Sequence, residues 1–85
     1  MPSEYQVVIV LDALEVLPRT GKRRTSVIKF MQGLKDFAFM GGDFQVKDPE
    51  THRSFEVSLV SGYAVTWWID APVNKVMVVD IRPSK

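Results

Sequence analysis

Two neighbouring residues, His52 and Arg53, are the first candidates for chemistry in this chain. His52 is the single histidine and the side chain that titrates near neutral pH, so it is a candidate acid or base. Arg53 and Arg82 are candidate ligands of a phosphate. Each also has a simpler interpretation. His52 would be an exposed loop residue, and Arg82 would solvate the edge of a sheet. Arg53 would pair on the surface with Asp48 or Glu50.

Positive charge is concentrated in one part of the sequence. The 17 residues from 19 to 35 contain six basic residues and no acidic residue, although the net charge of the chain is only +1. Such a segment is typical of contact with phosphate or with an acidic partner, and solvation of an exposed helix is the alternative. Three of the cations begin a predicted helix, where positive charge opposes the helix dipole, and this favours a binding role. The candidate contacts to nucleic acid are Arg19, Lys22, Arg23, Arg24, Lys47 and Lys85.

The composition excludes several classes of site. The chain has no cysteine and one histidine, so disulfides, cysteine-based zinc or iron–sulfur centres and histidine-cluster metal sites are excluded. We therefore expect no metal and no cofactor. The longest apolar run, Val7 to Leu11, is too short to cross a bilayer, and no signal peptide follows Met1. The expectation is a cytoplasmic protein without a membrane partner.

Apolar patterning predicts one strand and two helices in the first half of the chain. Tyr5 to Leu11 is rich in Val and Ile on both faces, which favours a central strand. A short helix over Ala13 to Leu17, capped by Asp12, is expected to follow. Lys22 to Ala38 is the predicted main helix, with Thr20 as its N-cap. An apolar stripe at helical spacing supports it: Val27, Phe30, Met31, Leu34 and Ala38.

Four further strands are predicted in the second half, over residues 43–48, 53–60, 63–70 and 75–81. The last three form a meander with turns at 61–62 and 71–74. Adjacent strand residues point to opposite faces, so one of Trp67 and Trp68 must lie in the core and the other on the open face. Trp68 and Tyr63 are the candidate contacts to a protein partner.

These elements predict a single domain over residues 1–85. The order β-α-α-β-β-β-β implies an α+β fold, a two-layer sandwich with the helices packed on one face of a largely antiparallel, twisted sheet. We expect the first strand to insert next to a strand of the meander, because an isolated position at the edge of the sheet would expose its apolar side chains to solvent.

Three segments resemble a known family. The segment Ala13 to Pro18, the Gly62-Tyr63 turn into an apolar strand, and the closing segment Val76 to Arg82 are similar to those of the RelE/ParE superfamily of toxins from bacterial toxin–antitoxin pairs. The resemblance implies a growth-inhibiting toxin that is held inactive by a cognate antitoxin protein. RelE-like members cut mRNA on the ribosome, whereas ParE-like members poison DNA gyrase.

The resemblance also implies roles for individual residues. In a RelE-like enzyme, His52, Arg53 and Arg82 would be catalytic, and the basic helix would contact the ribosome or mRNA. The expected function is therefore translation inhibition, with ribosome-dependent mRNA cleavage as its mechanism. Two alternatives stay open: a gyrase poison, and a non-enzymatic binding module on the same fold. Ala64 stands where the nuclease pattern has arginine, and the pattern's C-terminal tyrosine or histidine is missing, which favours these alternatives.

Overall fold

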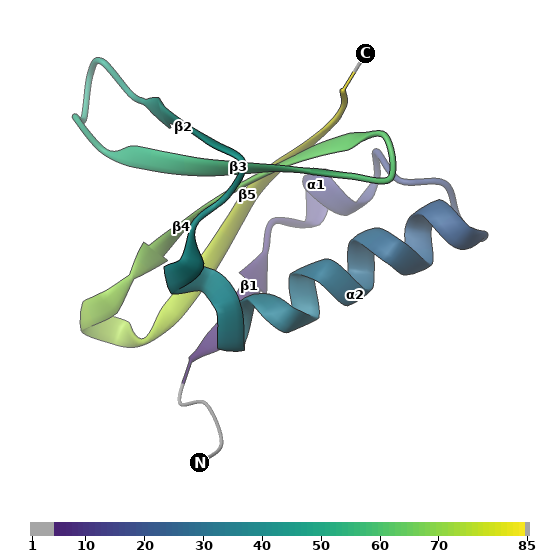
Figure 1. The fold of residues 1–85 in the computed structure, drawn as a ribbon, viewed down its shortest axis with the longest axis horizontal. Helices are drawn as coiled ribbons and strands as arrows, with labels where there is room; N and C mark the ends of the chain where they lie inside the picture. Colours follow the sequence, from purple (N-terminus) through teal and green to yellow (C-terminus); the bar gives the residue numbers. More distant parts are fainter. Residues whose placement is uncertain (1–4, 85) are drawn as a thin grey trace.

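A computed structural model describes residues 5–84, which form one long helix packed against a five-stranded sheet (Figure 1). The predicted α+β two-layer fold is confirmed. Two 3₁₀ turns interrupt the expected order of elements, and the first helix is a single turn. The elements are β1 (Gln6–Ile9), α1 (Leu11–Leu14), α2 (Lys22–Phe37), η1 (Ala38–Met40), β2 (Phe44–Lys47), β3 (Ser54–Val60), β4 (Tyr63–Asp70), η2 (Ala71–Val73) and β5 (Lys75–Pro83).

The strand order in the sheet is β1-β5-β4-β3-β2. The meander pairs are antiparallel, as expected, and β2 adds to β3 in the same way. β1 pairs in parallel with β5, so it does lie beside a strand of the meander, but the prediction that it is central is wrong. It can occupy an edge because Val7 and Ile9 pack against the core under α2.

The main helix α2 begins at Lys22, as predicted, whereas the start of α1 and the N-caps of both helices differ from the predicted ones. α1 begins at Leu11 with Val10 at its N-cap, so Asp12 lies inside the first turn and is not a cap. α2 is preceded by Gly21 rather than Thr20, with a φ of 106° at that glycine. A positive φ of this size favours glycine, which explains why the helix starts after Gly21. The Thr25 hydroxyl donates a hydrogen bond to the Gly21 carbonyl at 3.1 Å.

The core lies between α2 and the near face of the sheet. The stripe expected on α2 is buried at Val27, Met31, Leu34 and Ala38, whereas Phe30 is only partly covered. Strands β4 and β5 supply the opposite wall through fully buried side chains, which are Val65, Trp67, Val76, Val78 and Ile81. Trp67 is therefore the core tryptophan of the pair, and Trp68 faces the other way.

Candidate functional site

The face of the sheet that points away from α2 is the candidate functional site. Because Val65 and Trp67 are in the core, alternation along β4 places Ala64, Thr66 and Trp68 on this open face. The register then adds their partners on both sides. Thr66 lies between Val57 of β3 and Asp80 of β5, and Ala64 lies between Leu59 and Arg82.

A shallow groove with a volume of about 650 Å³ crosses this face. Phe44 and Val46 of the edge strand β2 are each 48% exposed, and Leu59 of β3 is 54% exposed. Large apolar side chains therefore remain in solvent on a surface that no helix of the described chain covers. The groove is lined by Phe44, Val46, Phe55, Val57, Ala64, Thr66, Val79, Asp80 and Arg82.

Arg82 closes the groove at one end and is paired with an acid. Its Nε donates to Asp80 Oδ2 at 2.7 Å, and both side chains reach solvent. Surface pairs of this kind contribute about 0–1 kcal/mol to stability. A phosphate that approached Arg82 would compete with the Asp80 carboxylate.

Arg53 lies at the opposite end of the open face. Its guanidinium carbon is 3.9 Å from the centroid of a Trp68 ring. Trp68 is half-buried beneath it. A cation placed over an indole face is an attractive arrangement, and it holds both side chains in place.

His52 belongs to a tight loop that joins β2 to β3. Its backbone N–H donates to the Asp48 carbonyl at 2.9 Å, and its φ is 60°. The Asp48 carboxylate accepts hydrogen bonds from the Glu50 N–H at 3.0 Å and the Thr51 hydroxyl at 2.9 Å. These two bonds, with a smaller contribution from the charge of Arg53, lower the pKa of Asp48. The His52 side chain itself is exposed.

The three predicted catalytic residues do not meet. Arg53 directly precedes β3, whereas Arg82 is level with Leu59 near the far end of that strand. Six residues of extended chain correspond to about 20 Å. Figure 1 shows the β2–β3 loop and the C-terminal end of β5 at opposite ends of the sheet. His52 and Arg53 are neighbours, but Arg82 forms a separate site with Asp80.

The predicted nucleic-acid contacts are also divided. Lys22 and Arg23 are exposed at the start of α2, on the opposite side of the sheet from the open face, and Arg19 is exposed in the preceding turn. Arg24 is half-buried, and its Nη1 donates to the Pro18 carbonyl at 3.4 Å. Lys47 lies on β2 at a position that alternates away from Phe44 and Val46. Lys85 lies outside the described residues.

Tyr63 does not share the open face with Trp68. Its side chain is 9% exposed and belongs to the core cluster under α2. The tyrosine therefore has little surface to offer a partner, whereas Trp68 keeps an accessible edge. Alternation gives the reason, since Tyr63 has the same parity as Val65 and Trp67. Phe44 and Val46 were not identified from the sequence as part of the open face. Their alternation with Gln45 and Lys47 was the signal that could have done so.

Within residues 5–84, no cluster of three His, Asp or Glu side chains could hold a metal ion, and no helix is long and apolar enough to cross a membrane. No protein-family model, curated protein or solved structure matches this chain. The open face is thus an apolar, groove-bearing surface with an arginine at each end. Its chemistry fits binding better than catalysis, because its titratable groups are spread along the sheet.

Proposed function

We propose that this chain is a protein-binding domain that contacts its partners through the open face of its sheet. The observation that carries the proposal is the exposure of Phe44, Val46 and Leu59 on one surface. Contiguous apolar surface on a small domain marks sites of contact with other proteins. Arg53 stacked on Trp68 adds the residue types that dominate binding energy at such contacts.

We further propose that the domain is the toxin of a toxin–antitoxin pair and acts in the cytoplasm. The resemblance to the RelE/ParE superfamily supports this role. A cognate antitoxin would then cover the open face and hold the toxin inactive. Removal of the antitoxin would expose the same apolar residues to the cellular target.

The distance between Arg53 and Arg82 favours inhibition by binding over RNA cleavage. Cleavage needs a base, an acid and cations around one phosphate. Residues about 20 Å apart along a sheet cannot surround a single phosphate. Inhibition of a target such as DNA gyrase by binding does not require these residues to lie close together. Ribosome-dependent mRNA cleavage is the second candidate, and the acid-free basic segment at residues 19–35 favours it.

Induced expression of the chain, alone and with the product of an adjacent gene, tests the proposal. We expect growth arrest without the second protein, recovery with it, and intact transcripts during the arrest. Cleaved transcripts on translating ribosomes would support the second candidate. Normal growth would refute the toxin role and leave the domain as a binding module without toxicity.

A pair of variants tests the surface itself. Phe44→Asp places a charge on the open face and should abolish both arrest and co-purification with the second protein. Leu11→Asp is the matched control, because Leu11 is 73% exposed but lies in α1, away from that face. Equal effects of the two substitutions would contradict the assignment of the open face.

A further inference from the structure

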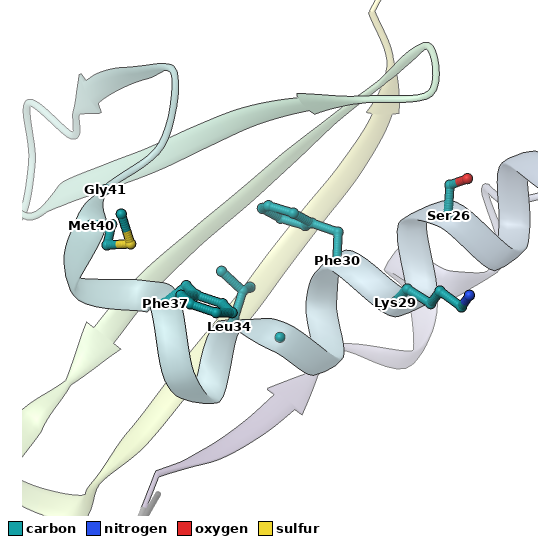
Figure 2. Close-up of a pocket in the computed structure, with 8 residues that line it drawn as sticks. Ser26, Lys29, Phe30, Leu34, Phe37, Met40 and Gly41 are labelled. Carbon is teal, nitrogen blue, oxygen red and sulfur yellow. The ribbon is translucent and has the colours of Figure 1, made fainter.

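A second groove, distinct from the open face, runs along one flank of α2 (Figure 2). Its volume is about 510 Å³. Phe37 and Met40 at one end are 61% and 80% exposed, so large apolar side chains stand in solvent here as well. The residues that line the groove are Ser26, Lys29, Phe30, Gly33, Leu34, Phe37, Met40 and Gly41.

The groove lies where the helical layer is incomplete. Five strands place the outer strand axes about 19 Å apart, whereas one helix with its side chains is about 10–12 Å wide. On the other flank of α2, Gln32 and Lys35 line a separate cavity together with Gln6 and Val7 of β1, so β1 lies on that side of the helix. The groove therefore faces the half of the sheet towards β3, which extends past α2 in Figure 1. α1 is a single turn and does not fill this place.

The shape of the groove suits a helix. Ser26, Phe30, Gly33 and Phe37 follow one another at i, i+4, i+7 and i+11 along one flank of α2. This row is about 16 Å long, or three helical turns. Gly33 adds no side chain to the middle of this row, so the groove there is bounded by the rings of Phe30 and Phe37, which Figure 2 shows on α2. A ridge of apolar side chains on a second helix would fit into it.

The charge around the groove is positive at one end. Lys29 lines it, and Lys22 and Arg23 lie one to two turns earlier on α2. Two carboxylates near the other end of the groove, those of Glu56 and Asp43, already accept hydrogen bonds from the backbone. Glu56 Oε1 accepts the Gly42 N–H at 2.8 Å, and Asp43 Oδ2 accepts the Leu59 N–H at 2.7 Å. Asp36 projects from the side of α2 opposite its buried stripe.

We propose that this groove binds an acidic, amphipathic α-helix of another protein. The apolar face of that helix packs on Phe30, Phe37 and Met40, and its carboxylates lie over Lys29 and the start of α2. The helix runs antiparallel to α2, because its negative C-terminal end is then next to Lys22 and Arg23. The inference does not depend on the proposed function, since the groove and the open face lie on opposite sides of the sheet.

Synthetic peptides test the chemistry of the occupant. The probe is an 18-residue helical peptide with leucine at i, i+3, i+4 and i+7 and glutamate on the flanks. Its control has the same leucines with lysine in place of glutamate. Fluorescence anisotropy of labelled peptide should give a dissociation constant at least about tenfold lower for the glutamate peptide than for the lysine peptide. Added salt should reduce this difference in affinity, because it screens the charges. Equal affinity for both peptides, or no binding of either, would overturn the proposal.

Two matched pairs of variants test the place of binding. Gly33→Leu fills the groove and should weaken binding of the glutamate peptide about tenfold or more. Gly33→Ala leaves the groove open and should not weaken this binding. Lys29→Glu should weaken it similarly to Gly33→Leu, whereas Lys75→Glu makes the same charge change on β5 and should not. Circular dichroism of each variant separates lost binding from lost folding. A folded Gly33→Leu variant that binds normally would place the peptide elsewhere.

Spin labels test the direction of the helix. A label at the C-terminus of the glutamate peptide should broaden the amide signals of residues 22–24, and a label at its N-terminus those of residues 37–41. Broadening in the reverse pattern would contradict the antiparallel arrangement. Broadening on β2 and β3 alone would show that the peptide occupies the open face instead.

Discussion

The guanidinium of Arg53 stacks on the indole of Trp68, with 3.9 Å between the guanidinium carbon and a ring centroid. This contact joins the β2–β3 loop to the middle strand of the meander. It also fixes the one tryptophan that the open face presents. Arg53 therefore has two roles: it stabilises the fold through its contact with Trp68, and it belongs to the surface that we propose binds a partner protein.

Replacement of Arg53 should separate these two roles. Arg53→Ala should lower the free energy of unfolding by about 0.5–1 kcal/mol, as for an exposed cation–π pair. It should weaken partner binding by more than this, because Trp68 becomes free to move. Urea unfolding and a binding titration measure the two effects. Arg82→Ala is the control for loss of an exposed arginine, and an identical binding loss in both variants would count against a special role for Trp68.

Gly42 should not tolerate a side chain. A Cβ at this position would lie 2.6 Å from the Val57 carbonyl oxygen. Because this oxygen belongs to the backbone of β3, the sheet would have to distort to relieve the clash. Gly42→Ala should lower the free energy of unfolding by about 1–3 kcal/mol. Gly33→Ala is the matched control, since its Cβ would meet Phe37 at an ordinary 3.6 Å and alanine should favour the helix by up to about 1 kcal/mol. Thermal unfolding of both variants should show shifts of opposite sign.

Trp67 is buried with an indole N–H that has no hydrogen-bond partner. Trp67→Ala should cost about 3–5 kcal/mol, as for other large core residues. Trp67→Phe should cost much less, because it keeps most of the apolar volume and removes an unpaired donor whose burial costs about 1–3 kcal/mol. Urea unfolding followed by circular dichroism compares them. Equal losses in the two variants would contradict this expectation.

His52 has a backbone conformation that favours glycine, with a φ of 60°. His52→Gly should leave the free energy of unfolding unchanged or raise it by up to about 1 kcal/mol. If growth arrest survives in this variant, the imidazole is not a catalytic acid or base. Ser61→Gly, at a φ of 50° in the β3–β4 turn, is the control for the backbone effect alone. Loss of arrest in His52→Gly only would favour the ribonuclease mechanism.

The carboxylate of Asp48 should make stability depend on pH. Hydrogen bonds from Glu50 and Thr51 lower the pKa of Asp48 below its ordinary value of 3.8. Its stabilising contribution is therefore fully present above that value and is lost as the pH falls through the lowered pKa. Asp48→Asn should be less stable than the parent protein at pH 7, and the difference should shrink below about pH 4. Thermal unfolding across this range measures it, and a constant difference would contradict the assignment.

Local spacing predicted the parts of the fold that depend on one element alone. The stripe on α2 and the opposite directions of Trp67 and Trp68 follow from helical and strand periods. The same alternation, applied to Tyr63, would have placed that residue in the core. The start of α2 at Lys22 was predicted correctly, but its N-cap is Gly21 rather than Thr20, because the positive φ at Gly21 is set by the turn rather than by capping chemistry.

The arrangement of the candidate site depended on the direction of strands. β3 and β5 both run antiparallel to β4, so they run parallel to each other. Arg53, which precedes the start of β3, and Arg82, which is near the end of β5, must then lie at opposite ends of the sheet. The order of strands in the sequence contained this information. The edge position of β1 was not predictable in this way, because nothing in its apolar pattern identifies the neighbouring strand.

The parallel pairing of β1 with β5 joins the first and the last strand of the described sheet, which has a consequence for folding during synthesis. In the sheet, β1 has β5 as its neighbour, and among the strands of residues 5–84 β5 is the last to be synthesised. Until then Val7 and Ile9 have no strand beside them, and α2 lacks one wall of its core. Contacts between distant parts of a chain form slowly and late. Nascent chains should therefore remain open to chaperones or to a partner until β5 emerges, so that the finished interaction surfaces arise only after synthesis of the whole domain.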